Sequence, residues 1–402
     1  MKYLIILGDG MADEPIEQLG GKTPLMAAET PNIDALCAKA RTGQLSTVPD
    51  DMPPASDVAN LGVLGYDVHD VYEGRGVLEA ASMGVEIAPG EMGMRCNIIC
   101  IEQENIKNHS AGHITSEEAA QLIDTLNQEL GSETVRFYPG VSYRHLLVVK
   151  QGVKQLDCTP PHDVPGALFR DKLIKAETPQ AQATADMLND LIFRSQRILQ
   201  DHPINQKRRA NGKDPGNSIW PWSPGYKPKM QTYNELYGIR SGAVISAVDL
   251  IQGIGVYAGF ENIKVQGATG LYDTNYEGKA EAAVNALKTH DFVYLHIEAS
   301  DEAGHEGDVD LKIKTIEYLD RRVVKYVMEA TANMGDVAIA LLPDHPTPCA
   351  VRTHTKAPVP FLMYHPGATP DAVTRYDEES VKAGYYGLLH GKQFIERLLQ
   401  TP

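Results

Sequence analysis

The sequence predicts an α/β protein that carries an inserted α+β domain, and three observations favour this class. Short apolar runs end in acidic or polar residues, as the strands of a buried parallel sheet do, at 3–7, 292–297 and 337–342. Helical patterns lie between and after these runs, at 277–289, 311–331 and 391–400. The middle of the chain follows a different pattern, which indicates a second domain.

The three apolar runs each lead into residues that can carry chemistry. The first is followed by Asp9, the second by Glu298 and Asp301, and the third by Asp344 and His345. In open α/β sheets, ligands bind beyond the carboxyl ends of the strands. The predicted sheet therefore places a candidate site at that edge.

The inserted domain is expected at 66–185. Residues 84–108 and 141–149 have strand patterns, and a helical stretch lies between them at 116–130. A further helical stretch at 181–200 leads out of the insertion. Residues 1–65 and 186–402 then form one discontinuous domain around it.

Composition narrows the classes of function. The 402 residues include 43% hydrophobic and 22% charged residues, as in ordinary globular proteins of two or three domains. A formal net charge of −16, with no long basic block, argues against nucleic-acid and membrane partners and favours a small-molecule substrate. The first apolar run is too short for a signal peptide, and the five cysteines form no paired C-x-x-C motifs. We expect a cytoplasmic protein with reduced thiols; the sequence leaves its oligomeric state open.

Four segments far apart in the sequence offer metal ligands or a nucleophile in short polar contexts. Their candidate residues are Asp9, Ser56, Asp301 with His305, and Asp344 with His345 and the nearby His354. Carboxylate oxygens combined with imidazole nitrogens suit Zn²⁺, Mn²⁺ or Fe²⁺ better than Ca²⁺. Three aspartates and three histidines suffice for two ions, and a pair of ions serves in-line displacement at phosphorus.

Ser56 is the candidate attacking oxygen. A serine hydroxyl is a weak nucleophile at neutral pH unless a base or a metal activates it. Residues 57–64 after it form a plausible helix, whose amino-terminal amides would favour a bound phosphate. Ser56 could thus be bound to a metal and lie at an anion-binding helix end.

Each segment also has a purely structural interpretation. Asp9 could be a turn residue, Ser56 a helix N-cap, and Asp301 with His305 a capped helix start. Asp344 and His345 could form a turn before proline, and His354 could be structural. The conjunction favours the metal site, because three of these segments follow strand-like runs that would end at one sheet edge.

Several motifs together resemble one known family. They are Ile6–Asp13, Pro54–Asn60, Asp301–His305 and Asp344–Pro348, with further matches at 74–80, 110–114, 267–270 and 358–361. In these motifs the sequence resembles the archaeal-type cofactor-independent, or 2,3-bisphosphoglycerate-independent, phosphoglycerate mutases of the alkaline phosphatase superfamily. The similarity extends over most of the chain.

The resemblance implies a fold, a reaction and a set of metal ligands. It implies an alkaline-phosphatase-like three-layer α/β/α domain whose insert is a substrate-binding cap. One metal would be held by Asp301, His305 and His354, and the other by Asp9, Ser56, Asp344 and His345. Ser56 would take the phosphoryl group of 3-phosphoglycerate and return it as 2-phosphoglycerate. The expected cofactors are two Mn²⁺ ions, with Mg²⁺ or Zn²⁺ as alternatives, and no bisphosphoglycerate.

The resemblance also implies substrate contacts from residues in and after the insert. They are His113, Arg144, His162, Asp163, Asn205, Arg208 and Arg209. Arginine suits this role because its planar fork binds carboxylate or phosphate through two hydrogen bonds. Arg208 and Arg209 could equally form a solvated basic turn. The catalytic lysine of the bacterial mutases has no equivalent that can be placed, and Lys279 lies in a divergent region.

Three other functions stay open at this point. The protein could be a phosphotransferase for another small hydroxyl compound, as a homoserine kinase is, although it has no Gly-x-x-x-x-Gly-Lys-Ser/Thr motif. It could be a metal-dependent phosphatase in which water takes the phosphoryl group from Ser56. It could also bind metal or a phosphosugar without catalysis, but binding alone requires no serine at the metal.

Overall fold

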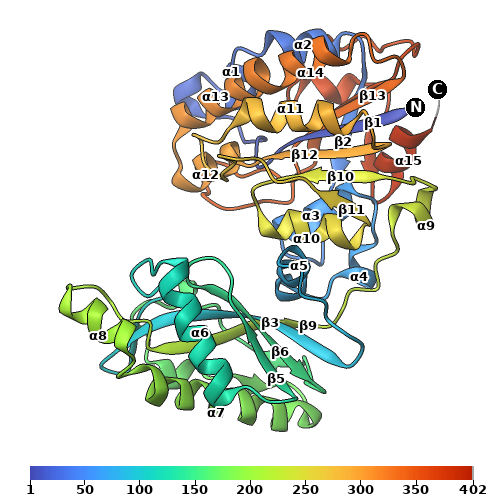
Figure 1. Cartoon of the computed structure of the whole chain (residues 1–402). Helices are drawn as coiled ribbons and strands as arrows, with labels where there is room; N and C mark the ends of the chain where they lie inside the picture. Colours follow the sequence, from blue (N-terminus) through green and yellow to red (C-terminus); the bar gives the residue numbers. More distant parts are fainter. Residues whose placement is uncertain (401–402) are drawn as a thin grey trace. The chain divides into compact units, whose positions relative to one another are not determined.

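An eight-stranded sheet organises the larger part of the chain in the computed structural model, which describes residues 1–400 (Figure 1). The strand order is β11-β10-β12-β1-β13-β14-β2-β15. In chain order the strands are β1 (Lys2–Gly8), β2 (Arg41–Ser46), β10 (Gly242–Ile245), β11 (Phe260–Asn262), β12 (Phe292–Ile297), β13 (Val337–Leu342), β14 (Val359–Tyr364) and β15 (Leu388–His390). The three apolar runs predicted as strands are therefore β1, β12 and β13.

The direction of the strands gathers their carboxyl ends at one edge. β1 lies between β12 and β13 and is parallel to both. β14 is antiparallel to its two neighbours, β13 and β2. The loops after β1, β12 and β13 consequently lie beside one another, at the edge where ligands bind in such sheets.

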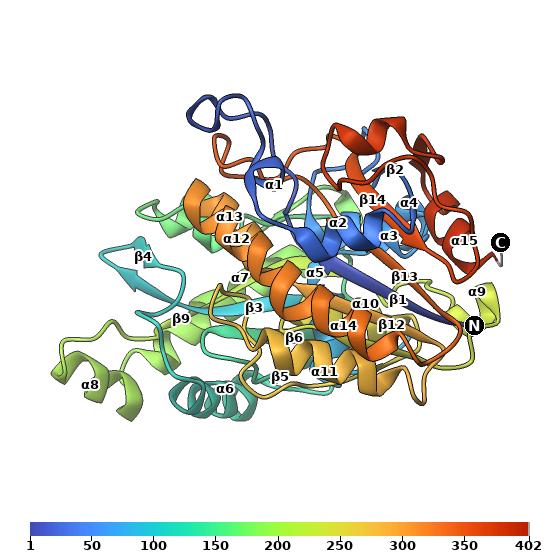
Figure 2. The ribbon, with the colours of Figure 1, turned by 90° about the horizontal axis from the view of Figure 1, so that it is seen from above.

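Helices cover both faces of this sheet (Figures 1 and 2). They are α1 (Pro24–Ala27), α2 (Pro31–Cys37), α3 (Ser56–Val63), α4 (Val68–Val71), α9 (Tyr233–Tyr237), α10 (Asp249–Tyr257), α11 (Tyr276–Ala286), α12 (Ala299–Glu306), α13 (Val309–Tyr318), α14 (Lys325–Thr331) and α15 (Gln393–Leu399), with short 3₁₀ helices at Glu17–Leu19 and Ser380–Ala383. One buried cluster joins α2, α11, α13 and α14 to the strands, and α3 and α10 lie on the opposite face. The arrangement is a three-layer α/β/α sandwich.

A π-helical turn, η5 (Leu319–Val324), interrupts the long helix between α13 and α14. It presents the buried Asp320 to the first turn of α2, where its carboxylate accepts hydrogen bonds from the amides of Asn32 (2.9 Å) and Ile33 (2.7 Å). The carboxylate also accepts a bond from the side chain of Asn32 (2.6 Å). Asp320 thus satisfies amides that a helix start leaves without partners.

A second compact unit, Glu73–Pro228, is built on an antiparallel sheet. Its strands are β3 (Glu91–Glu102), β4 (Asn105–Asn108), β5 (Val135–Tyr138), β6 (Arg144–Lys150) and β9 (Ser218–Gly225), with a separate pair formed by β7 (Leu156–Asp157) and β8 (Lys175–Ala176). Its helices are α5 (Arg75–Ser82), α6 (Ser116–Leu130), α7 (Gln182–Leu199) and α8 (Pro203–Ala210), with 3₁₀ helices at Pro161–Asp163, Phe169–Lys172 and Pro179–Ala181. This unit has its own hydrophobic core, to which α6 and α7 contribute.

The limits of this unit differ from the expected 66–185. The segment that follows the expected end belongs to the unit, because β9 pairs with the long strand β3 and α7 packs Leu188, Leu191 and Ile192 into the same core. Residues 66–72 belong instead to the larger compact unit, which contains the large sheet. This unit comprises Met1–Tyr72 and the chain from Lys229 onward. The domain boundary at 185 is therefore corrected to Pro228.

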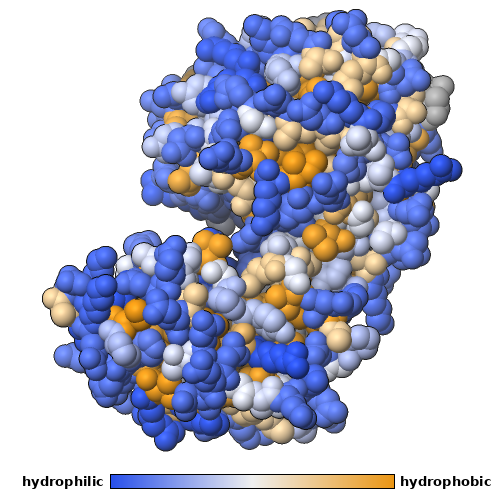
Figure 3. Space-filling view, in the orientation of Figure 1, coloured by the Kyte–Doolittle hydropathy of each residue, from blue (hydrophilic) through white to orange (hydrophobic). Residues whose placement is uncertain are grey.

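The surface of the molecule is mainly hydrophilic in the view of Figure 3, where hydrophobic residues appear as small separate patches. Within residues 1–400, no helix combines the length and the apolar character that crossing a membrane requires.

Candidate functional site

Two groups of carboxylate and imidazole side chains lie at the carboxyl edge of the large sheet. Asp9 follows β1, Asp301 and His305 lie on α12 directly after β12, and Asp344 and His345 follow β13. His354 lies further along the loop that begins after β13. In each group the ligand atoms lie within 4.8 Å of one another. The structure therefore brings together all six predicted metal-binding aspartates and histidines.

The first group consists of Asp301, His305 and His354. Asp301 and His305 are four residues apart on α12, so they share one face of the helix. Nε2 of His305 lies 3.2 Å from Oδ2 of Asp301, and Nε2 of His354 lies 3.4 Å from Oδ1. The two Nε2 atoms are 2.9 Å apart. Three ligand atoms thus converge on one point.

Backbone carbonyls fix the orientation of both rings. Nδ1 of His305 lies 3.1 Å from the carbonyl oxygen of Arg352, and Nδ1 of His354 lies 3.1 Å from that of Pro54. Since a carbonyl only accepts, each Nδ1 carries a proton, and in the neutral rings the two Nε2 lone pairs face each other. That arrangement is repulsive unless a cation lies between them, so this group fits a metal ion.

Electrostatics in this group reflect the same pairing. Burial by itself raises the pKa of Asp301, but hydrogen bonds with His305 and His354 hold it well below its usual range. The hydrogen bond with Asp301 raises the pKa of His305 to about 9. A proton on His305 thus occupies, in the metal-free protein, the place that a cation would take.

The second group consists of Asp9, Asp344 and His345, all three buried. Nε2 of His345 lies 3.3 Å from Oδ2 of Asp344 and 3.7 Å from Oδ1 of Asp9. Burial, followed by the charges of Asp344 and Asp301, raises the pKa of Asp9 well above its usual range. Oδ1 of Asp9 is buried and has no hydrogen-bond partner among the described residues. An orphaned acceptor among like charges fits a second cation.

Ser56 lies at the second group. Its Oγ is 3.2 Å from Nε2 of His345. Ser56 is the first residue of α3, and the N-cap position belongs to Ala55, which makes no side-chain cap bond. The N-cap interpretation of Ser56 is therefore wrong, and its hydroxyl is directed to the proposed ligands instead.

Further side chains hold the second group in place, and the sequence analysis did not identify them. Nε2 of His296 lies 2.9 Å from Oδ2 of Asp9. The amide of Asn60 donates to Oδ2 of Asp344 (2.8 Å), and the hydroxyl of Tyr294 donates to Asn60 (2.6 Å). Asn60 follows Ser56 by four residues on α3, which is a signal that helical spacing contains. The positions of His296 and Tyr294 on an apolar strand give no such signal.

Lys279, whose role the sequence left open, lies on α11. Its side chain is fully buried, and Nζ donates to the carbonyl oxygens of Thr269 (3.3 Å) and His296 (3.4 Å). Burial lowers the pKa of Lys279 to about 8.

Several predicted substrate contacts gather in the second unit around His109. The ring of His109 packs edge-on against the rings of Tyr143 and His162, with ring centroids 5.3 Å and 6.0 Å apart. Arg144 lies over the ring of Tyr143, and Asp163 lies 3.6 Å from His162. His113 lies in the same turn as His109, at 109–113, and its charge, after burial, lowers the pKa of His109. The predicted residues His113, Arg144, His162 and Asp163 therefore lie in one neighbourhood.

Two predicted substrate contacts are structural, and that prediction is corrected. Asn205 is fully buried, donates to the carbonyl oxygens of Leu199 and Gly216 (both 2.8 Å) and accepts from the amide of Gly216 (2.8 Å). Arg208 is also buried; it pairs with Glu118 and donates to the carbonyl oxygen of Asp214 (2.8 Å). Both side chains hold α8 and its following loop, so neither is free for a ligand.

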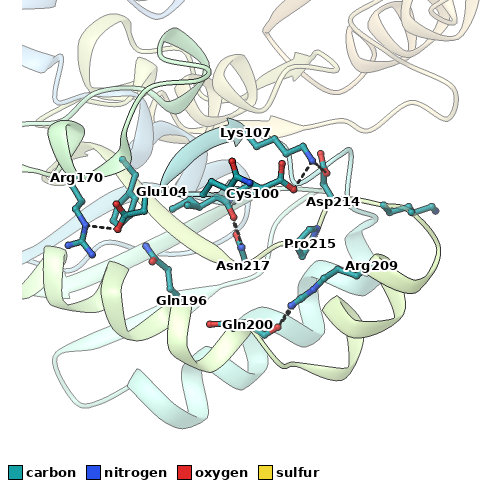
Figure 4. Close-up of a pocket in the computed structure, with 16 residues that line it drawn as sticks. Cys100, Glu104, Lys107, Arg170, Gln196, Gln200, Arg209, Asp214, Pro215 and Asn217 are labelled. Atoms are coloured by element: carbon teal, nitrogen blue, oxygen red, sulfur yellow. Dashed lines mark hydrogen bonds and ion pairs between the residues drawn. The ribbon is translucent and has the colours of Figure 1, made fainter.

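Arg209 lies apart from the His109 neighbourhood, in a cavity of about 600 Å³ in the second unit (Figure 4). Its guanidinium donates to the carbonyl oxygen of Gln200 (2.8 Å). Two other cations of the cavity form ion pairs, Lys107 with Glu102 (3.0 Å) and Asp214 (2.9 Å), and Arg170 with Glu104 (3.1 Å). None of the predicted metal ligands lines this cavity.

Comparisons with known proteins show which family the chain resembles over its length. A family model described as 2,3-bisphosphoglycerate-independent phosphoglycerate mutase matches residues 37–205. A protein of that name from Methanosarcina acetivorans is 51% identical, over 100% of both chains. The PH0037 protein of Pyrococcus horikoshii has a similar structure, with a TM-score of 0.84, 30% identity and coverage of 99% of this chain and 96% of the other. The cofactor-independent phosphoglycerate mutase of Thermoplasma acidophilum aligns with a TM-score of 0.70, 28% identity and coverage of 100% and 99%.

Identity at this level over the full length of both chains leaves no part of the sequence outside the match. The residues that converge at the sheet edge come from segments spread between Asp9 and His354, so the match includes all of them. The chain belongs to the 2,3-bisphosphoglycerate-independent phosphoglycerate mutase family.

Proposed function

We propose that this protein interconverts 3-phosphoglycerate and 2-phosphoglycerate through a phosphoserine at Ser56, without bisphosphoglycerate. The observation that carries the proposal is the 3.2 Å distance between Oγ of Ser56 and Nε2 of His345, inside a group of buried carboxylates. The name of the Methanosarcina acetivorans relative supports the substrate pair. A binding protein would have no use for a hydroxyl directed into such a group.

Two divalent cations fit the two groups. Asp301, His305 and His354 would hold one ion, and Asp9, Ser56, Asp344 and His345 the other. The facing Nε2 atoms and the orphaned Oδ1 of Asp9 support this assignment. Ions there would neutralise phosphoryl charge and favour the ionised serine hydroxyl. We propose Mn²⁺, with Mg²⁺ or Zn²⁺ as alternatives, since mixed oxygen and nitrogen ligands accept each of them.

The residues of the chain account for the order of bond changes. Oγ of Ser56 gives up its proton and forms a bond to phosphorus as the bond from phosphorus to the 3-oxygen of the glycerate breaks, and the 3-oxygen takes up a proton. The 2-hydroxyl then gives up its proton and attacks the same phosphorus, and Oγ of Ser56 is released and regains a proton. Amides of the first turn of α3 lie next to Ser56, where they favour the charge of the phosphoryl group.

The polar residues around His109 are the proposed substrate contacts in the second unit. Arg144 would pair with a carboxylate or phosphate through two parallel hydrogen bonds. His113, His162 and Asp163 would hold the remaining polar groups of the glycerate. Arg209 stays in the proposed set, because its exposed guanidinium keeps N–H groups beyond those that bind Gln200.

A coupled assay tests the proposal. Metal-loaded protein with 3-phosphoglycerate and enolase should form product without added bisphosphoglycerate. Ser56→Ala should lower turnover by at least about a thousandfold, because a nucleophile is lost. Ser380→Ala, which changes a serine at the start of another helix, should retain activity.

Three results would contradict the proposal. Full turnover by Ser56→Ala would exclude a phosphoserine intermediate at this residue. Release of inorganic phosphate from many esters, without 2-phosphoglycerate, would identify a phosphatase. Phosphorylation of homoserine that requires ATP would identify a kinase.

The cellular context is also proposed. A small phosphorylated substrate is consistent with a cytoplasmic enzyme, and the five cysteines are free thiols in the structure. Fractionation of the native cells, with detection of the protein in each fraction, tests this location.

A further inference from the structure

A buried ammonium group connects the segments that carry the proposed metal ligands. Lys312 lies on α13, and its side chain has 0% exposure. Its Nζ donates to the carbonyl oxygens of Ala12 (3.1 Å) and Thr347 (2.8 Å). Ala12 belongs to the loop that carries Asp9, and Thr347 to the loop that carries His345. One charged group thus holds both loops, from a helix that directly follows α12 with Asp301.

Asp13 is the counter-ion of this lysine. Its Oδ2 accepts from Nζ of Lys312 (2.8 Å) and from the amide of Cys349 (3.1 Å). Its Oδ1 accepts from the amide of Glu14 (2.8 Å). Both carboxylate oxygens therefore have partners, and the bond from Cys349 is a further connection between the loop after β1 and the loop after β13.

Thr347 transmits the position of this ion pair to both metal groups. Its amide donates to the carbonyl oxygen of Ala12 (3.2 Å), and its carbonyl oxygen is held by Lys312. Its hydroxyl lies 2.5 Å from Oδ1 of Asp301 and 3.3 Å from Nδ1 of His345. Thr347 therefore contacts one member of each group.

Stability alone does not explain a buried lysine at this place. Lysine is seldom fully buried, and a buried ion pair commonly contributes no more to folding than apolar side chains of the same volume. What the pair adds is geometry, because three acceptors from two loops must meet one nitrogen atom.

We propose that Lys312 and Asp13 form a positioning clamp that fixes the spacing between the two metal groups. The inference rests on the metal centre of the proposed function. Neither residue touches substrate in this scheme, and both act through the loops that carry Asp9, His345 and Thr347.

The test uses paired substitutions in the full-length protein. Lys312→Met removes the clamp but leaves Asp13 as an unpaired buried charge, so Lys312→Met/Asp13→Asn is made beside it. Lys312→Gln is a second route to a folded variant, since its amide can still donate to one carbonyl. Lys314→Met is the matched control, because Lys314 is exposed on the same helix.

Cobalt(II) is the probe, and thermal unfolding of the metal-free proteins shows which variants fold. The control and the unchanged protein should bind two Co²⁺ ions with the same visible absorption spectrum. Folded clamp variants should bind at least one ion about tenfold or more weakly, with a changed spectrum. Their kcat for 3-phosphoglycerate should fall at least tenfold while KM changes little.

Two sets of results would overturn the clamp. The first is a folded variant whose Co²⁺ affinity, spectrum and kcat equal those of Lys314→Met. The second is that no clamp variant shows an unfolding transition, because the pair would then be needed for folding as a whole. If the unchanged protein binds two Co²⁺ ions but shows no mutase activity, the proposed function fails. The Co²⁺ affinities and spectra of the clamp variants and of Lys314→Met still test the clamp. If it binds no pair of ions, both fail.

Discussion

At the scale of single residues, backbone carbonyls decide how the histidines of the first metal group are presented. The carbonyl groups of Arg352 and Pro54 accept hydrogen bonds from Nδ1 of His305 and His354. Arg352 itself has a left-handed backbone conformation, with φ of 60°. A non-glycine residue there carries strain, and in this loop the strained residue is the one whose carbonyl orients His305.

Metal affinity should depend on pH through His305. Its pKa is raised to about 9 by Asp301, so in the metal-free protein the pair stabilises the fold fully below pH 6.5, and this stability is lost as the pH rises through 9. A metal requires the neutral ring, so Mn²⁺ affinity should rise from pH 6.5 to 9, by up to roughly tenfold per unit for the one proton displaced. Calorimetric titrations in buffers of different ionisation enthalpy measure that proton.

The control for this prediction is His390→Ala, which removes an exposed histidine outside both metal groups. It should leave the pH dependence unchanged, whereas His305→Ala should bind weakly with a flatter profile. Affinity that is constant between pH 6.5 and 9 would contradict the pairing of His305 with Asp301.

Residue types in short motifs were sufficient to predict the aspartates, the histidines and Ser56 as one group. They were not sufficient to predict the roles of Asn205 and Arg208. These side chains have the donor groups of a substrate contact, but they donate to neighbouring backbone carbonyl oxygens. A sequence shows which hydrogen bonds a side chain can make. It does not show which partners reach that side chain first.

At the scale of elements, α3 positions Ser56 through a close approach to the end of β2. Gly62 lies on the face of α3 that meets the backbone of Thr47, and a Cβ there would collide with the carbonyl oxygen of Thr47. Glycine at this position allows the helix to approach the sheet closely. The first turn of α3, with Ser56, is thereby set against the loop after β13.

The π-helical turn should be needed for the stability of α2. Asp320→Ala removes an acceptor shared by the amides of Asn32 and Ile33. Since bonds to a charged acceptor contribute about 1.5–3 kcal/mol each and orphaned amides are costly, we expect a loss of roughly 2–4 kcal/mol. Urea unfolding measures it, with Asp310→Ala on the exposed side of α13 as the control. Equal stability of the two variants would contradict this role.

Local signals predicted some elements closely and others only in outline. The helix expected at 116–130 is α6 with the same limits, because a capping box of Thr115 and Glu118 marks its start. The strand expected at 84–108 is divided into β3 and β4 by a turn at Gln103 and Glu104, both with positive φ. Neither residue favours that conformation intrinsically, so the turn has no signal in the local sequence.

At the scale of the whole molecule, each unit has a separate hydrophobic core. The core of the larger unit lies between its sheet and helices such as α2 and α11, and that of Glu73–Pro228 lies between its own sheet and α6 and α7. Every proposed metal ligand belongs to the larger unit. Metal binding should therefore stabilise the larger unit directly and not Glu73–Pro228.

Calorimetry should show this separation as two unfolding transitions. Mn²⁺ at a hundred times its dissociation constant should stabilise the larger unit by about 2.7 kcal/mol per site and raise its midpoint, while the transition of Glu73–Pro228 stays in place. A chelator should reverse the shift, and Asp344→Asn should remove much of it. An equal shift of both transitions would show that the units unfold together.

The sequence by itself determined the class of sheet, the chemical types of the metal ligands and the serine among them, because strand periodicity and short polar motifs are local properties of a chain. Tertiary structure decided where the second unit ends, since β9 must find β3 across more than a hundred residues. It also decided that Lys312 and Asp13 meet, and that Lys312 binds Thr347, which contacts one member of each metal group. Such pairings depend on which distant segments pack together, and no local pattern encodes that choice.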